Sequence, residues 1–152
     1  MPVRHNFKNL KVWQKAMDLA DLVFEFSKGL PVMEKYNLID QINRCSVSIP
    51  SNIAEGSGKR TNVHFAEFLS TSISSSYELE TQLIICERRN YGSAEVLKNV
   101  FELLGEVQRM LFNFREYIVN DKFIWSQILF IIEQSPDSWF PTLDSLLWMY
   151  RK

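Results

Sequence analysis

The sequence has few of the residues on which most active sites depend. Among 152 residues there are two histidines, His5 and His64, and two cysteines. A carboxylate-bridged metal pair in a helical bundle needs two Glu-x-x-His units, whereas Glu67 follows His64 in the reverse order. No serine lies in a G-x-S-x-G elbow, and residues 56–59 (GSGK) lack the spacing of a Walker phosphate loop. We therefore expect no enzyme, no cofactor and no metal.

Strong charge and long apolar runs are also missing. The formal net charge is −1, which argues against a dedicated nucleic-acid-binding protein but leaves a local basic patch open. Apolar runs such as Ile128 to Ile132 fall far short of the ~18 residues of a membrane span, so we expect no membrane partner. Met1 to Leu10 has no apolar signal-peptide core, which predicts a cytoplasmic location. There we expect Cys45 and Cys86 to be buried thiols without a disulfide.

What the sequence does contain is helical periodicity. Apolar residues recur at spacings of three and four over residues 10–28, 34–57, 62–89 and 93–119, and Gly or Pro residues punctuate the ends. In the first of these segments the expected apolar stripe is Leu10, Trp13, Ala16, Met17, Ala20, Val23 and Phe24. No strand pattern is present. Four long helices with short loops predict an all-α fold, an antiparallel up-down four-helix bundle with a C-terminal helical extension.

Two helices carry unusual residues. Pro50 lies inside the second segment, where we expect either a kink near residues 47–50 or a break into two helices. The third segment is almost entirely Ser and Thr over residues 70–76. Because apolar periodicity continues on both sides of this run, we interpret it as a surface for close helix packing.

The sequence divides into three expected parts. Residues 1–9 read as an N-terminal arm, residues 10–119 as the four-helix bundle, and residues 120–152 as an aromatic-rich C-terminal extension. Asn120 and Asp121 are expected to break the fourth helix, and apolar stretches at 123–132 and 139–150 predict two shorter helices. We expect this extension to pack on the bundle or on a neighbouring subunit.

Several polar residues lie in apolar or small-residue surroundings. We expect a polar structural or interface site at Arg44, Asn52, Glu55 and Glu78, because a carboxylate in such surroundings needs a cation or backbone donors. Arg44 is the expected partner. The alternatives are a polar site at a subunit surface and a structural ion pair that fixes helix register. In either case, replacing Glu55 by Ala should weaken folding or assembly more than replacing Glu106.

Three groups of residues carry a family resemblance. The first is Phe7, Leu10, Val12, Trp13, Ala16 and Leu19. The second is Tyr36, Leu38, Gln41 and Arg44, followed by residues 46–50 (SVSIP), residues 52–56 (NIAEG) and Gly58. The third is Phe65, Phe68, Leu69, Ser75, Tyr77, Glu78, Leu79, Glu80 and Leu83. Over about Phe7 to Ile118 the chain resembles the small bacterial four helix bundle proteins, also called 23S rRNA intervening-sequence proteins. The extension from Asn120 departs from the family pattern.

This resemblance implies a bundle that associates into a ring, commonly a homopentamer, and it does not imply an enzyme. A related branch, the accessory variability determinant of diversity-generating retroelements, forms a basic barrel that binds nucleic acid and a reverse transcriptase. Two hypotheses follow for this chain. The first is a non-enzymatic oligomeric scaffold or adaptor. The second is an accessory module that binds RNA or a nucleic-acid-processing protein, with Lys59 and Arg60 repeated around a ring to form a basic face.

Overall fold

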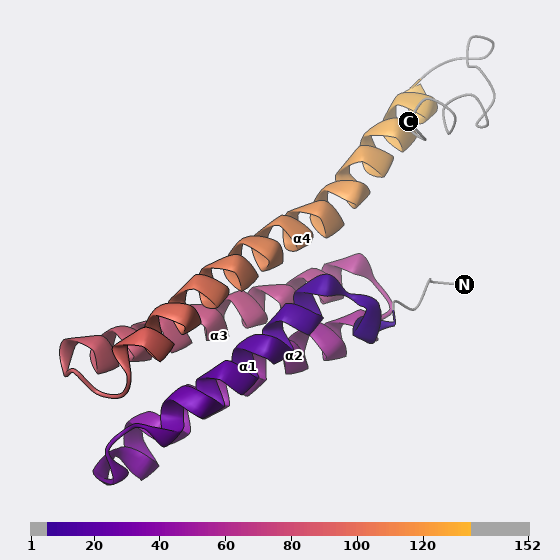
Figure 1. Cartoon of the computed structure of the whole chain (residues 1–152). Coiled ribbons are helices and arrows are strands. Elements are labelled where there is room, and N and C mark those ends of the chain that lie inside the picture. The colour runs from indigo at the N-terminus through magenta and orange to yellow at the C-terminus, as the bar shows by residue number, and fades with distance from the viewer. Residues whose placement is uncertain (1–5, 135–152) are drawn as a thin grey trace. The chain divides into compact units, whose positions relative to one another are not determined.

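The chain folds into helices (Figure 1). The computed structural model describes the backbone of residues 6–134 and the side chains of residues 6–120. Its elements are η1 (Phe7–Asn9), α1 (Lys11–Lys28), η2 (Val32–Glu34), η3 (Lys35–Ile39), α2 (Asp40–Ser57), α3 (Asn62–Arg88) and α4 (Ala94–Gln134). Residues 6–134 contain no strand. The predicted all-α fold with four long helices is therefore confirmed.

Short polar residues and glycines set the helix ends where the sequence predicts them. The Thr61 side chain accepts a hydrogen bond from the backbone N–H of His64 at 3.3 Å and so caps α3. Ser93 does the same for Val96 at the start of α4. Between α3 and α4, Asn90 and Gly92 take positive φ angles of 54° and 74°, which these two residue types tolerate best.

The approach to α2 differs from the prediction. The sequence predicts a helix from Glu34, whereas the α-helix begins at Asp40, after a 3₁₀ turn (η2) and a π-helical turn (η3). Pro31 holds the chain extended at φ −58° and ψ 133°, and residues 32–39 form the 3₁₀ turn and the π turn before the α-helix begins. The wider π turn absorbs extra residues, and Leu38 reaches the core four residues before Ile42.

Pro50 does not divide the second helix, so the predicted alternative of two separate helices is wrong. α2 runs unbroken from Asp40 to Ser57 with Pro50 inside it. A proline leaves one carbonyl of the preceding turn without its usual donor. Two side chains donate to that turn: Ser51 Oγ to the carbonyl oxygen of Val47 at 2.8 Å, and Asn52 Nδ2 to that of Ser48 at 2.8 Å.

The fourth helix is longer than predicted. α4 continues through Asn120 and Asp121 to Gln134, so the expected break there is wrong. Asn and Asp have only modestly unfavourable helix propensities, and neither is a proline or glycine that would end a helix. The chain divides into one unit ending at Asp121 and a second beginning at Lys122. The predicted helix at 139–150 lies outside the described residues.

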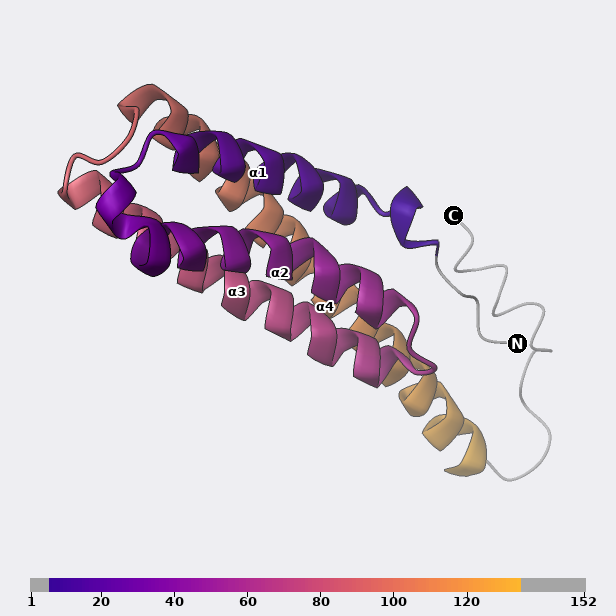
Figure 2. The same ribbon diagram turned by 90° about the horizontal axis from the view of Figure 1, so that it is seen from below.

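Residues spaced by three and four form one core. Val12, Ala16, Leu19, Val23 and Phe26 bury one face of α1, and α4 contributes Leu97, Val100, Leu104, Val107, Leu111 and Ile118 to the same cluster. This alternation of three and four is the spacing by which helices pack at a shallow angle. Figures 1 and 2 show α1, α2 and α3 side by side along their lengths.

Hydrogen bonds and ion pairs fix which helices are neighbours. Ser72 Oγ of α3 donates to the carbonyl oxygen of Ile49 in α2 at 3.0 Å, and Ser48 and Ser75 share a bond of 2.9 Å, so residue numbers rise in opposite directions along these two helices. Arg115 of α4 bonds to Ser70 of α3 at 2.7 Å. Lys15 of α1 pairs with Glu106 of α4 at 3.1 Å. The helices therefore follow one another around the bundle, with α4 beside α1.

The serine-rich run of α3 is a surface for close helix packing, as the sequence predicts, and the structure places α2 against it. Ser72 and Ser76 are fully buried, and their small side chains let the two backbones approach. Among the described residues, no helix is both long and apolar enough to cross a membrane.

Candidate functional site

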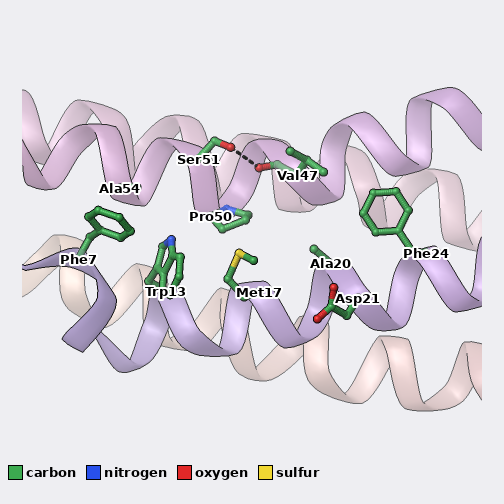
Figure 3. A pocket seen from close by; sticks show the side chains of 10 residues that line it. All are labelled: Phe7, Trp13, Met17, Ala20, Asp21, Phe24, Val47, Pro50, Ser51 and Ala54. Atoms are coloured by element: carbon green, nitrogen blue, oxygen red, sulfur yellow. Dashed lines mark hydrogen bonds between the residues drawn. The ribbon is translucent and has the colours of Figure 1, made fainter.

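An apolar groove runs between α1 and α2 (Figure 3). One wall consists of Phe7, Trp13, Met17, Ala20, Asp21 and Phe24, and the other of Val47, Pro50, Ser51 and Ala54. Three of its large side chains keep much of their surface in water: Met17 is 38% exposed, Phe24 41% and Val47 43%. The groove is the candidate functional site of the described part of the chain.

The α1 wall arises from a second apolar stripe. Val12, Ala16, Leu19, Val23 and Phe26 face the core, whereas Trp13, Met17, Ala20 and Phe24 repeat the same spacing one position later along the chain. A single core-facing helix needs only one such stripe. The sequence-based stripe for α1 mixed both sets, so it placed Met17 and Phe24 in the core. The structure leaves both of them exposed at the groove.

One end of the groove is built by the N-terminal segment. Phe7 of η1 packs edge-to-face on Trp13, with ring centroids 5.1 Å apart and an interplanar angle of 72°, which is a favoured aromatic geometry. Gln14 Nε2 donates to the carbonyl oxygen of Lys8 at 2.8 Å and holds η1 against α1. The segment predicted as an arm is thus folded onto the bundle from Phe7 onward.

The α2 wall offers no free hydrogen-bonding group of its own. Pro50 has no N–H, and the Ser51 hydroxyl donates back to the Val47 carbonyl within the helix (Figure 3). Ala20 of α1 and Ala54 of α2 contribute only methyl groups to the lining. Asp21 is the one charged residue among those that line it. Such a surface can bind apolar side chains, because water leaves it at little polar cost.

The polar residues predicted as one site do not come together. Arg44 pairs with Asp40 of its own helix at 3.7 Å, and Glu55 pairs with Lys59 at 2.9 Å. Arg44 is therefore not the partner of Glu55 that the sequence suggests. Both pairs join residues four apart on an exposed helix face, so the carboxylate of Glu55 finds its cation locally and is not desolvated.

Asn52 and Glu78 lie near the contact between α2 and α3. Asn52 Nδ2 donates to the backbone oxygen and the hydroxyl of Ser48 at 2.8 and 3.0 Å. Glu78 accepts from Gln82 Nε2 at 3.4 Å. Burial, followed by the neighbouring Glu78 carboxylate, raises the pKa of the Cys45 thiol to about 11. Asn52 and Glu78 thus bond within their own helices, and neither residue lines the groove.

Lys59 and Arg60 lie together at the turn between α2 and α3. They line a surface hollow with Gly58, Thr61 and His64. The Lys59 ammonium is already engaged, because it pairs with Glu55 and stands 4.4 Å from the ring centroid of Phe68. Arg60 has no ion pair among the described residues, so it is the freer cation of the two. His5 lies outside the described residues.

The side chains that could bind a metal ion lie apart in the described part of the chain. Within residues 6–120, no three His, Cys, Asp or Glu side chains converge as metal ligands would. Cys45 and Cys86 are both buried and free, and burial raises the pKa of the Cys86 thiol to about 11. Thiols so strongly protonated at neutral pH are poor nucleophiles and poor ligands.

Comparison with known proteins agrees with this architecture. The family model of the 23S rRNA-intervening sequence protein matches residues 8–113. A crystal structure of a protein of unknown function from the S23 ribosomal protein family of Bacteroides thetaiotaomicron VPI-5482 shares 23% sequence identity. That match covers 69% of this chain and 95% of the other, with a TM-score of 0.64, and it shows a common fold. No curated protein matches the chain. With more than half of its length matched by the family model, this chain belongs to the family of 23S rRNA-intervening sequence proteins.

Proposed function

We propose that this protein is a non-enzymatic helical scaffold that associates with copies of itself through the α1–α2 groove. The observation that carries the proposal is the groove itself, whose lining has a single charged side chain, Asp21. Contiguous exposed apolar surface on a folded domain commonly marks an interaction site. The ring-shaped assemblies implied by the family resemblance support the same reading.

Physical chemistry favours a protein partner for this surface. About two-fifths of the surface of each of Met17, Phe24 and Val47 is exposed to solvent. Burying such side chains is favourable by roughly 25 cal/mol for each Å² of apolar area. The Ser51 hydroxyl in the α2 wall is bonded within its own helix, so contact with another apolar surface leaves few polar groups beyond the Asp21 carboxylate unsatisfied. Aromatic residues and Met are also the residue types enriched in interface cores.

The test is the mass of the protein in solution, measured by size-exclusion chromatography with light scattering. We expect a homo-oligomer for the wild-type chain and a monomer of 17.9 kDa for Val47→Glu, which places a carboxylate in the groove. The matched control is Val32→Glu, at an exposed residue of η2 outside the groove, and it should keep the wild-type mass. A monomeric wild-type protein at micromolar concentration contradicts the proposal.

A second candidate function is an accessory role in binding RNA. The supporting observation is the hollow at the α2–α3 turn, where Lys59, Arg60 and His64 surround the N-terminus of α3 and no carboxylate is among the lining residues. Phosphates favour such positions because helix N-termini present free N–H groups and a positive dipole end. A symmetric oligomer would repeat this weak site several times.

The RNA-binding candidate is best tested by replacing Arg60 alone, and not Lys59 and Arg60 together. Lys59→Glu also removes the contacts to Glu55 and Phe68, so Arg60→Glu is the cleaner variant. The measurement is fluorescence anisotropy of a labelled single-stranded RNA at several salt concentrations. Binding that falls steeply with salt and is lost in Arg60→Glu supports this function. Arg44→Glu is the matched control. Equal binding by all three proteins rejects this site.

A further inference from the structure

A second uncharged surface lies on the opposite side of the bundle from the groove. Since α1 contacts α2, α2 contacts α3, and α4 contacts both α3 and α1, the outer faces of α3 and α4 point away from the α1–α2 groove. Their exposed stripe consists of Ser74, Tyr77, Thr81 and Ile84 of α3 together with Phe112 of α4. We call these five residues the α3–α4 ridge.

The ridge projects large apolar side chains into solvent. Tyr77 is 55% exposed, Ile84 41% and Phe112 54%. Phe112 belongs to the border with α3, because Gln108 and Arg115, four before and three after it, bond to Glu80 and Ser70 of α3 at 2.8 and 2.7 Å. The α3 members follow spacings of three and four, which is the spacing by which one helix meets another.

The serine and threonine hydroxyl groups of this stripe are satisfied by their own helix. Ser74 Oγ donates to the carbonyl oxygen of Ser70 at 3.1 Å, and Thr81 Oγ1 donates to that of Tyr77 at 2.9 Å. Thr71, beside the ridge, donates to Glu67 in the same way. Burying a hydroxyl costs most when its donor is left without a partner. Apart from the Tyr77 hydroxyl at the tip of its side chain, the ridge can therefore enter an apolar contact at low polar cost.

Two exposed aspartates border the groove and two exposed arginines border the ridge, where Glu78 and Glu87 of α3 are exposed as well. Asp18 and Asp21 lie exposed on α1 along the groove, and neither forms an ion pair among the described residues. Arg88, four residues after Ile84, and Arg109, three residues before Phe112, are exposed and also without an ion pair in residues 6–120. Complementary charges around an apolar centre are a common feature of specific interfaces.

We propose that the α3–α4 ridge of one copy of this chain seats in the α1–α2 groove of the next copy. This inference rests on the proposed function, that the chain associates with itself, and it names the surface that fills the groove. The contact joins one surface of one copy to a different surface of the next copy, so it is head-to-tail. Such contacts close into rings or continue as open chains, unlike a two-fold contact in which one surface meets itself.

Two substitutions each remove one half of the contact. Met17→Arg places a cation in the groove, and Tyr77→Arg places one on the ridge. Both side chains are exposed in the single chain, so helicity and thermal midpoint should stay close to wild type. Met33→Arg and Tyr36→Arg make the same exchanges at exposed residues of η2 and η3 and serve as matched controls. We expect loss of the oligomer in the first two variants and the wild-type mass in both controls.

Mixing the two variants tests the head-to-tail geometry. Met17→Arg retains an intact ridge and Tyr77→Arg an intact groove, so a one-to-one mixture should form a complex with one copy of each, detected by native mass spectrometry with one variant isotope-labelled. An intact oligomer in Tyr77→Arg, together with no mixed complex, overturns the ridge assignment while leaving self-association through the groove in place. A monomeric wild-type chain instead overturns the proposed function on which this inference rests.

Discussion

At the scale of single residues, glycines show how tightly α2 and α3 approach. A Cβ atom on Gly56 would lie 2.6 Å from the Phe65 ring and 2.7 Å from Cβ of Phe68. The Phe68 Cβ moves only with its backbone, so the helices would have to separate. By contrast, a Cβ on Gly105 of α4 would meet only Arg109 Nη1, at 3.5 Å.

These two glycines should respond to alanine with opposite signs. We expect Gly56→Ala to lower the free energy of unfolding by about 1–3 kcal/mol, the usual range for overpacking. Gly105→Ala should raise it by about 0.5–1 kcal/mol, because alanine is the better helix former. Urea denaturation followed by circular dichroism measures both. A Gly56→Ala variant as stable as wild type would show that the α2–α3 contact is looser than described.

The ion pairs reverse one expectation from the sequence. Glu55 pairs with Lys59 one turn away, whereas Glu106 of α4 pairs with Lys15 of α1. All four side chains are at least a third exposed, so each pair contributes at most about 1 kcal/mol. We expect Glu106→Ala to destabilise the fold at least as much as Glu55→Ala, as measured by thermal unfolding. A clearly larger effect of Glu55→Ala would favour the sequence-based interpretation.

At the scale of helices, the contact between α2 and α3 depends on small polar side chains. Ser72 is fully buried and bonds across to Ile49, whereas Ser74, two residues later, is exposed and bonds within α3. The same residue type therefore has two different roles on the two sides of one helix.

Substitutions at these two serines should separate the roles. Ser72→Val adds volume where the helices touch and removes the donor to Ile49, so we expect a loss of about 1–3 kcal/mol. Ser74→Val removes only a bond within the helix and should change stability by less than about 0.5 kcal/mol. Chemical denaturation of both variants against wild type checks the difference, and equal losses would argue against a close α2–α3 contact.

The helices themselves were predictable, because periodicity and capping residues are local signals. α1 and α3 begin and end within one residue of the predicted bounds. The π turn before α2 and the continuation of α4 past Asn120 depend on packing and on weak propensities, which a single sequence does not resolve. The groove was missed because Met17 and Phe24 also fit a helical stripe. The sequence signal that could have predicted the groove is the presence of two apolar stripes on α1, offset from each other by one residue.

At the scale of the whole molecule, one core holds both thiols. Cys45 of α2 and Cys86 of α3 belong to the same buried cluster as residues of α1 and α4. We therefore expect both thiols to react with a disulfide reagent at pH 8 only as fast as the bundle opens, with rates that rise together in denaturant. Rapid labelling of one thiol in the native protein would show that part of the bundle opens separately.

The raised thiol pKa values also predict the response to alkali. Burial favours the neutral thiols in the folded chain, where both pKa values are about 11, against the ordinary value of 9.0. The unfolded chain therefore ionises first, so this contribution to stability is complete below pH 9 and is lost as the pH rises toward 11. Replacing both cysteines by alanine should flatten the fall in unfolding free energy across that range. An unchanged slope would contradict this.

The neighbourhood of α1 and α4, marked by the pair Lys15–Glu106, has a consequence for synthesis on the ribosome. α2 and α3 are joined by residues 58–61 and can form a hairpin as soon as both have emerged, because contacts close in sequence form fastest. The core faces of α1 and α3 stay uncovered until α4 emerges as far as Ile118. The growing chain therefore exposes parts of two apolar helix faces until α4 has emerged, and such exposed surface is prone to aggregate. A chain stalled before α4 has left the ribosome should aggregate, whereas a chain stalled once Ile118 has emerged should form a folded bundle.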